Sequence, residues 1–281
     1  MRYSRGISYV EIGVTDMQRS VDFYRGLLGF GQLDDAPDEQ TWLTAGPVPV
    51  KLVYAGPAGN LRGWESDDLQ RGLRHVGLKV GDVDLQAERL RDAGVRFTLE
   101  PLDAVGDVRI AFFTDPDGAL LEILEGHLRY SATWSQPLAD RERAAAERRP
   151  REAGPVFDHI AVTVEDLDQT LARYRDGLGY EVIGQLDHAQ DQRGFLITYL
   201  QAGDAVLEVF SYRAPKSPSP WGPEPDRTGH RGVGIGAGDP AGTADRLCAM
   251  GGTCVTAADG GQVLLDPDGI PLRLETAEAS S

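Results

Sequence analysis

The chain has 281 residues and a formal net charge of −16, with 41% hydrophobic and 26% charged residues. No cluster of Lys and Arg stands clear of acidic neighbours, so neither a nucleic acid nor an anionic membrane is expected as a partner. No run of roughly eighteen apolar residues is present, which argues against a membrane span. The opening stretch MRYSRGISYV lacks the pattern of a signal peptide, and the only cysteines are Cys248 and Cys254. We therefore expect a cytoplasmic protein with free thiols.

The chain carries an internal repeat, and its first and third copies match most closely. Residues 9–16 read YVEIGVTD and residues 159–166 read HIAVTVED. In each copy a Tyr-Arg pair follows, with its Tyr 15 positions after the first residue of the segment, and then comes Leu-Gly-Phe or Leu-Gly-Tyr. This agreement in register indicates that one structural unit has been duplicated.

A second pair of copies is interleaved with the first. Residues 75–82 (HVGLKVGD) and 232–239 (GVGIGAGD) each precede a predicted helix that ends at a glycine, Gly94 or Gly251, and later an Asp-Pro-Asp-Gly turn and an apolar strand. The Asp that closes each segment can cap the following helix, and the glycine can adopt the left-handed conformation that ends it. The sequence therefore predicts an α+β fold made of four βαβββ modules.

The predicted modules cover residues 1–57, 70–127, 155–213 and 229–276. We expect the first two modules to form one domain over residues 1–127 and the last two a second domain over residues 155–281. Residues 128–154 are highly polar and include a strong helical pattern, so they are predicted to be a helical linker on the surface. The stretch 214–231, rich in Pro, Gly and Trp, is either a lid or a long loop. Three histidines fall in predicted loops and are expected at the surface: His127, His188 and His230.

The alternation of side chains along a strand singles out four residues as candidate metal ligands. The apolar residues after His75 share one face of their strand, so the imidazole points to the other face, and the same holds for His159. Glu122 and Glu208 lie inside apolar strands, where a carboxylate is costly to bury unless a cation binds it. Each Glu follows its His at a similar distance, 47 and 49 positions. A single strand His is more often a hydrogen-bonded core residue, but two matching pairs favour a site for Zn, Ni, Co, Fe or Mn.

The combined pattern resembles the vicinal oxygen chelate superfamily. The features that carry the resemblance are the His in the first strand, Phe/Tyr-Tyr-Arg before Leu-Gly-Phe/Tyr, and Asp-Pro-Asp-Gly before a Glu-bearing strand. The superfamily includes glyoxalase I, methylmalonyl-CoA epimerase, extradiol dioxygenases and fosfomycin- or bleomycin-resistance proteins. The resemblance implies that the modules pair into two curved-sheet, glyoxalase-like half-barrels, each enclosing one cavity.

Which modules pair decides whether the four candidate ligands meet. The equivalent residues of the first and last strands are Tyr9 with Lys51, His75 with Glu122, His159 with Glu208, and Gly232 with Arg273. If neighbouring modules pair, each cavity holds half a site. If the second module pairs with the third, one cavity collects two His and two Glu. We favour the second arrangement, because two separate half-sites would be of little use; pairing across a homodimer would also complete a site.

The resemblance implies a divalent metal ion as cofactor and a small-molecule substrate. We expect an isomerase, epimerase or lyase of the glyoxalase type that acts on a small 2-hydroxy or 2-oxo carbonyl compound through an enediolate-like intermediate. Either Glu122 or Glu208 would move the proton. The main alternative is an iron-dependent extradiol-type dioxygenase that cleaves a catechol or hydroquinone. In its commonest type the iron ligands come from the third and fourth modules. Here the fourth module has Gly232 and Arg273 at the ligand positions, which counts against that type. A third alternative is a resistance protein that binds a drug without catalysis.

Overall fold

The computed structural model describes residues 4–33, 39–188, 190–257 and 260–276, and within them each predicted module consists of a strand, a helix and three further strands. The first module contains β1 (Ser4–Val14), α1 (Met17–Val21), β2 (Gly31–Gln32), β3 (Gln40–Thr44) and β4 (Pro49–Tyr54). The second contains β5 (Gly72–Lys79), α2 (Val83–Asp92), β6 (Phe97–Ala104), β7 (Val108–Thr114) and β8 (Leu120–Glu125). The third contains β10 (Val156–Val164), α4 (Leu167–Leu171), β11 (Glu181–His188), β12 (Phe195–Ala202) and β13 (Ala205–Ser211). The fourth contains β14 (Gly229–Ala237), α5 (Pro240–Ala249), β15 (Thr253–Thr256), β16 (Gln262–Leu265) and β17 (Pro271–Thr276).

The strands form two sheets, and each sheet joins one module from before the linker to one module from after it. The eight-stranded sheet has the order β15-β16-β17-β14-β1-β4-β3-β2 and joins the fourth module to the first. The nine-stranded sheet has the order β6-β7-β8-β5-β10-β13-β12-β11-β9 and joins the second module to the third. The α+β fold of four modules paired into two curved sheets is therefore confirmed. Both sheets contain strands from either side of the linker. The division into domains 1–127 and 155–281 stays a prediction.

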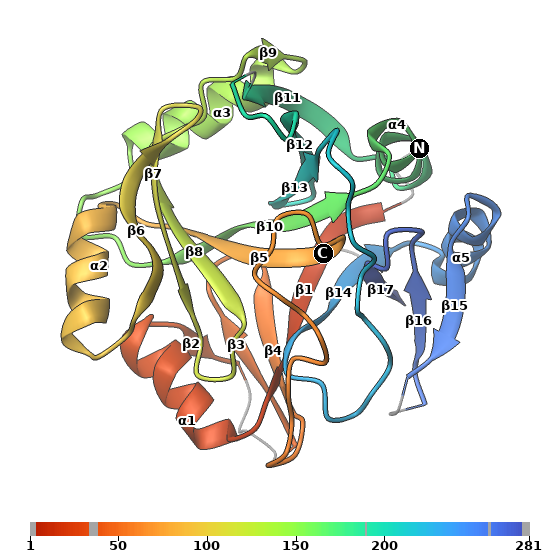
Figure 1. Ribbon diagram of the computed structural model, residues 1–281, viewed down its shortest axis with the longest axis horizontal. Coiled ribbons are helices and arrows are strands. Elements are labelled where there is room, and N and C mark those ends of the chain that lie inside the picture. The colour runs from red at the N-terminus through yellow and green to blue at the C-terminus, as the bar shows by residue number, and fades with distance from the viewer. Residues whose placement is uncertain (1–3, 34–38, 189, 258–259, 277–281) are drawn as a thin grey trace.

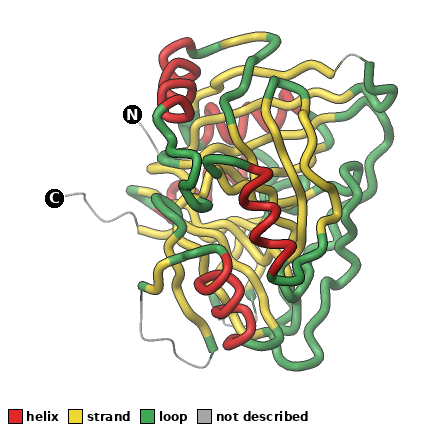
Figure 2. The backbone as a smooth tube through the Cα atoms, turned by 90° about the vertical axis from the view of Figure 1, so that its left-hand side faces the viewer, coloured by secondary structure: helices red, strands yellow, loops and turns green. Residues whose placement is uncertain are grey.

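The two first strands of the paired modules lie side by side at the centre of each sheet. β5 pairs with β10 in an antiparallel arrangement, and each of them pairs in parallel with the last strand of its own module, β8 or β13. Figure 1 shows β5 and β10 crossing the middle of the molecule, with β6, β7 and β8 on one side and β11, β12 and β13 on the other. In Figure 2 the strands make up the bulk of the molecule and only a few short helices accompany them. This arrangement brings the first and last strands of the second and third modules to one place.

The module helices begin at capping Asp residues, as the sequence predicts. Asp82 accepts a hydrogen bond from the Leu85 amide at the start of α2, and Asp166 caps α4 in the same way. α1 and α4 each continue into a π-helical turn, η1 (Asp22–Leu27) and η2 (Ala172–Gly177). The turn η1 places the Tyr24 hydroxyl 2.9 Å from Oδ2 of Asp115, in the Asp-Pro-Asp-Gly turn of the next module. The helices and turns thus connect the first module to the second and the third to the fourth, whereas the sheets connect the first to the fourth and the second to the third.

The linker is more than a connection. It contains α3 (Gln136–Glu147) and a short strand, β9 (Ala132–Thr133), which pairs with the edge strand β11. Leu138 of α3 is buried in a small apolar cluster with Ile183 and Leu186 of β11. The helical prediction for this segment therefore holds, and the linker also covers one edge of the nine-stranded sheet.

The loop at residues 214–228 lies alongside the loop between the first and second modules. Ser217 and Arg227 form isolated bridges with Gln70 and Asn60, respectively. Trp221 donates a hydrogen bond from its indole to the Arg231 carbonyl and lies against the eight-stranded sheet. The stretch is therefore a long structured loop. Among the described helices, none is long and apolar enough to cross a membrane.

Candidate metal centre

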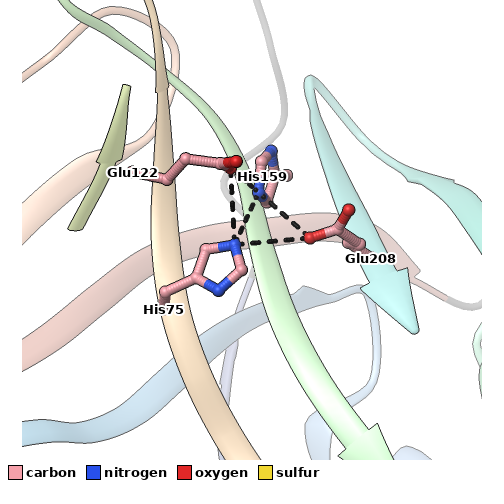
Figure 3. A group of neighbouring side chains, drawn as sticks. All are labelled: His75, Glu122, His159 and Glu208. Carbon is pink, nitrogen blue, oxygen red and sulfur yellow. Dashed lines mark hydrogen bonds and ion pairs between the residues drawn. The ribbon is translucent and has the colours of Figure 1, made fainter. Parts of the chain in front are cut away.

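The four predicted ligands converge on one point of the nine-stranded sheet. His75 lies on β5, Glu122 on β8, His159 on β10 and Glu208 on β13, and Figure 3 shows their side chains directed toward one another. The register explains this convergence: Gly77 of β5 stands opposite both His159 and Glu122. Side chains at alternate positions of these central strands share the concave face, while their neighbours pack into the core.

The donor atoms lie at short and nearly equal distances. His75 Nε2 is 3.1 Å from His159 Nε2 and 3.4 Å from Oε2 of both Glu122 and Glu208. His159 Nε2 is 3.1 Å from Glu122 Oε2 and 3.3 Å from Glu208 Oε2. One ligand atom from each residue fits within a group whose members are all within 4.8 Å of one another. All four residues are buried, each being 6% exposed or less.

Burial and mutual attraction set the charges of this cluster. Burial by itself would lower the pKa of both imidazoles, but the attraction of the two nearby carboxylates raises it above the usual value for His. Burial by itself would raise the pKa of Glu122 and Glu208, but the two imidazoles lower it. The cluster therefore strongly favours positive charge beside its carboxylates, which protons or a metal ion can supply.

The arrangement of the donors fits a divalent cation. Glu208 Oε2 is shielded from solvent and accepts no hydrogen bond of good geometry from any described residue, although two imidazole nitrogens lie nearby. Ligands held at about 2.1 Å from one ion are separated by about 3.0–3.4 Å at octahedral or tetrahedral angles. The observed separations of 3.1–3.4 Å agree with that spacing. Two imidazoles with two carboxylates form a donor set that first-row metals accept.

Three supporting residues orient the cluster, and the sequence analysis did not identify them. Asp158 Oδ2 lies 2.9 Å from His159 Nδ1, so that ring presents Nε2 to the cluster. Tyr199 stands opposite Glu208 in the register of β12 and β13, and its hydroxyl interacts electrostatically with that carboxylate. At Gly77, a Cβ would overlap the His159 ring. The Asp next to His159 was a usable signal in the sequence, whereas Gly77 and Tyr199 become significant only through strand pairing.

The cluster lies in a cavity of about 530 Å³ on the concave face of the sheet. Most of its lining is apolar and comes from the second and third modules, and it includes Phe112, Ile110, Phe195, Ile197 and Phe210. The linker also contributes: Leu128, Tyr130 and Glu142 line the cavity, and Glu142 accepts hydrogen bonds from the Leu128 amide and the Tyr130 hydroxyl. No residue of the fully described loop 214–228 is among the lining residues, which argues against the lid hypothesis.

A comparison with protein families identifies the fold. The model of the Glyoxalase/Bleomycin resistance protein/Dioxygenase superfamily matches residues 6–123 and 156–274. The chain belongs to this superfamily. The resemblance to vicinal oxygen chelate proteins that the sequence motifs predict is thereby confirmed.

Several members of the superfamily are similar to this chain. The lactoylglutathione lyase of Pseudomonas aeruginosa is 30% identical over 153 residues, which cover 43% of this chain and 82% of the relative. A probable chloroplastic lactoylglutathione lyase of Arabidopsis thaliana is 26% identical over 196 residues, or 66% of this chain, and the match spans only 47% of that relative. Glyoxalase I from Zea mays superposes with a TM-score of 0.66 at 22% identity, over 96% of this chain and 91% of that chain. A putative dioxygenase from Bacillus subtilis superposes with a TM-score of 0.62 at 17% identity, over 100% of this chain and 87% of that chain. At these identities the two structures establish the fold.

The other sheet of this superfamily member has ion pairs at the equivalent place. Glu11 is 2% exposed, and its carboxylate lies 3.3 Å from Lys51 Nζ, 3.2 Å from Arg231 Nε and 3.6 Å from Arg273 Nε. In the register of β1 it occupies the place that Ala161 has in β10. Lys51 and Arg273, which are equivalent in position to Glu208 or Glu122, thus lie together around Glu11, and Glu11 was not identified from the sequence.

Two of the three other histidines differ from the loop prediction, whereas His127 lies in the loop after β8 and is half-buried. His230 lies in β14, is half-buried and hydrogen-bonds through Nε2 to the Leu120 carbonyl at 3.1 Å, so its expected place on a surface loop was wrong. Burial lowers the pKa of His230 to about 4, and its imidazole is neutral at physiological pH. His188 is exposed, as expected, but it is the last residue of β11 and lies at the cavity. Two strands thus extend farther than the apolar pattern indicates.

Proposed function

We propose that this protein is a metal-dependent isomerase or lyase of the glyoxalase type, acting on a small 2-hydroxy or 2-oxo carbonyl compound. The observation that carries the proposal is the convergence of two imidazoles and two carboxylates in a mostly apolar cavity. Relatives named lactoylglutathione lyase, at 25–31% identity, support the same reaction class. A cytoplasmic location and a possible homodimer stay predictions.

In this proposal His75, Glu122, His159 and Glu208 hold one divalent ion of the Zn, Ni, Co, Fe or Mn group. When bound, such an ion acts as a Lewis acid on a carbonyl oxygen and its vicinal oxygen, which makes the intervening C–H bond more acidic. Asp158 holds His159 in the tautomer that presents Nε2. The apolar lining keeps bulk water away from the reacting carbons.

The two carboxylates are not equivalent, and the difference favours Glu122 as the group that moves the proton. Glu208 has a polar partner across the strand pair, the Tyr199 hydroxyl, which interacts with its carboxylate. The corresponding partner of Glu122 is Phe112, which offers no hydrogen bond. Outside the cluster, no described side chain holds the Glu122 carboxylate. Glu122 is therefore the freer base, and it would take the proton from one carbon and return it to the neighbouring carbon.

The test measures proton exchange with solvent. Protein loaded with one equivalent of zinc, nickel or cobalt is incubated in D2O with a panel of 2-hydroxy ketones and thiol adducts of 2-oxoaldehydes, and deuterium at the α-carbon is followed by NMR. We expect exchange by the wild type, loss of exchange in Glu122→Gln and a smaller decrease in Glu208→Gln, with metal content measured for all three. Absence of exchange for every metal and compound would refute the proposal.

A second candidate function is the cleavage of an aromatic ring with oxygen. The specific observation that favours it is the row of aromatic side chains along the cavity, which suits a catechol or hydroquinone. Four protein donors leave fewer open positions for substrate and oxygen than the three usual for such iron sites. Oxygen uptake by the iron-loaded protein with catechols, without α-proton exchange, would favour this alternative. Binding of a drug without catalysis would give neither signal.

A further inference from the structure

The cavity wall beside the candidate metal centre carries several aromatic side chains. The rings of Phe195 and Phe210 are parallel to within 2°, with centroids 5.5 Å apart, and Tyr212 continues the stack at 5.1 Å from Phe195. At the inner end, Phe210 lies 6.1 Å from the His75 ring, and Phe112 meets the same imidazole edge-on at 4.9 Å. A row of aromatic rings therefore leads to the candidate ligands. Aromatic side chains bind planar rings by offset or edge contacts.

Further aromatic and apolar side chains line the cavity. Tyr130 and Tyr199 meet edge to face at 5.6 Å, and both line the cavity. Leu99 and Leu102 of the edge strand β6 are each 37% exposed and line the same cavity. The space between the walls, about 530 Å³, is within the range of about 300–1,000 Å³ that holds a ligand the size of a drug.

The cations that line the cavity are already engaged. Arg193 donates to Asp191 at 2.7 Å and to Asp68 at 2.9 Å. Lys79 Nζ donates to the Gly126 carbonyl at 3.0 Å and lies 4.0 Å from Asp158.

The third cation is Arg74, which is 4% exposed. It donates to the Glu65 carbonyl and to Gln70 Oε1, and its guanidinium covers the Trp64 ring at 4.8 Å. All three cations therefore interact with groups of the protein itself.

The balance of charge disfavours an anionic ligand. Outside the four-residue cluster, the described lining has five carboxylates and three cations, which are Asp68, Asp103, Glu142, Asp158 and Asp191 against Arg74, Lys79 and Arg193. The whole chain carries a formal charge of −16. A carboxylate on the ligand would lie beside a lining of net negative charge whose cations are already paired. No ion pair would therefore offset the free energy of its desolvation.

We propose that the substrate is a neutral molecule in which an aromatic ring lies next to the two vicinal oxygens. The ring packs along Phe195 and Phe210, and the oxygens reach the cluster of His75, Glu122, His159 and Glu208. This inference rests on the proposed function for the role of the oxygens. The inference excludes a glutathione adduct as the substrate, because the free carboxylates of glutathione would have no cationic partner in this cavity.

The experiment compares three probes by calorimetry on protein loaded with one equivalent of zinc. 2-Hydroxyacetophenone has the ring and the vicinal oxygens and is neutral. Hydroxyacetone lacks the ring, and 4-(hydroxyacetyl)benzoate carries a carboxylate at the far end of the ring, away from the vicinal oxygens. We expect 2-hydroxyacetophenone to bind at least about tenfold more tightly than either of the others. Equal or tighter binding of hydroxyacetone or of the benzoate would overturn the inference.

Two variants locate the ring. Phe195→Ala removes part of the wall without touching the candidate ligands and is expected to weaken 2-hydroxyacetophenone about tenfold while leaving hydroxyacetone unchanged. Phe23→Ala is the control, because Phe23 is a partly buried aromatic residue packed against the core outside the cavity. Unchanged affinity in Phe195→Ala, at full zinc content, would refute the placement.

The calorimetric readout keeps the two proposals apart. If 2-hydroxyacetophenone binds with the expected preference but no compound undergoes α-proton exchange, the substrate inference stands and the proposed reaction fails. If exchange occurs preferentially with the anionic or the ringless compound, the reaction stands and the substrate inference fails.

Discussion

A single methyl group at Gly77 should leave the fold intact and disrupt the proposed metal site. Gly77 has no positive φ, so alanine can adopt its backbone conformation. A Cβ at this position would lie less than 3.0 Å from Cε1, Nδ1 and Nε2 of His159. The obstructing atoms are at the end of a side chain, so the chain can fold by moving the imidazole aside. The metal site has no such freedom.

The expected loss follows from comparing two tolerances. Carbon atoms in contact are separated by about 3.5–4.0 Å, so the His159 ring must move by at least about 1.5 Å. Metal–ligand distances are held to within about 0.2 Å. The displaced imidazole is therefore lost as a ligand, and zinc affinity should fall at least about a hundredfold, since even a change in a residue behind a ligand costs about 10–100-fold.

The eight-stranded sheet supplies a matched control. Gly234 occupies the equivalent place in β14, and a Cβ there would overlap the Tyr9 ring in the same manner. Gly234→Ala should therefore impose a similar steric demand without affecting zinc. The assay is a competition titration with a chromogenic chelator, with thermal unfolding of both apo variants. Unchanged zinc affinity in Gly77→Ala, or an equal loss in both variants, would refute the reasoning.

Three further predictions concern the rest of the molecule. Burial raises the pKa of Asp115 from 3.8 to about 6, so its contribution to stability is fully present below pH 4 and is lost as the pH rises through about 6. Asp115→Asn should remove up to about 3 kcal/mol of that decrease in the free energy of unfolding, which urea unfolding at pH 4–7 measures. An unaltered slope of the unfolding free energy against pH would contradict the prediction. Glu11→Ala should destabilise the fold by about 3 kcal/mol, because it leaves the surrounding cations without their carboxylate, while zinc stoichiometry stays the same. An unfolding midpoint equal to that of the wild type would count against it. Sγ of Cys248 lies 3.4 Å from Sγ of Cys254, so a mild peroxide should convert the two thiols into one disulfide with the loss of two hydrogens, visible as a 2 Da decrease by mass spectrometry and absent in Cys254→Ser. Retention of both thiols under these conditions would disprove it.

Local patterns carry much of the site. The alternation of apolar residues around His75 and Glu122 is enough to place both on the face opposite the core, because a strand turns successive side chains to opposite sides. The capping Asp residues and the matching spacing of the repeats likewise predict where each module begins. These features depend on residues a few positions apart, so a single sequence contains them.

Contacts between distant segments are of another kind. Whether His75 meets His159 depends on β5 pairing with β10 across 84 positions, and the repeat pattern is equally compatible with pairing of neighbouring modules. The same pairing gives Gly77 its importance and places Tyr199 beside Glu208. No short-range pattern marks these residues, because their partners are chosen by register.

The sequence by itself determined the four modules, the superfamily and the four candidate ligands, since repetition and alternation are local properties of the chain. Only the tertiary structure decided that the ligands share one cavity, that the linker helps to wall it, and that Glu11 in the other sheet is neutralised by Lys51 and two arginines. The physical reason is that hydrogen bonds between strands and the pairing of buried charges depend on the whole molecule. The strand pairing of lowest free energy is therefore selected among pairings that look alike along the chain.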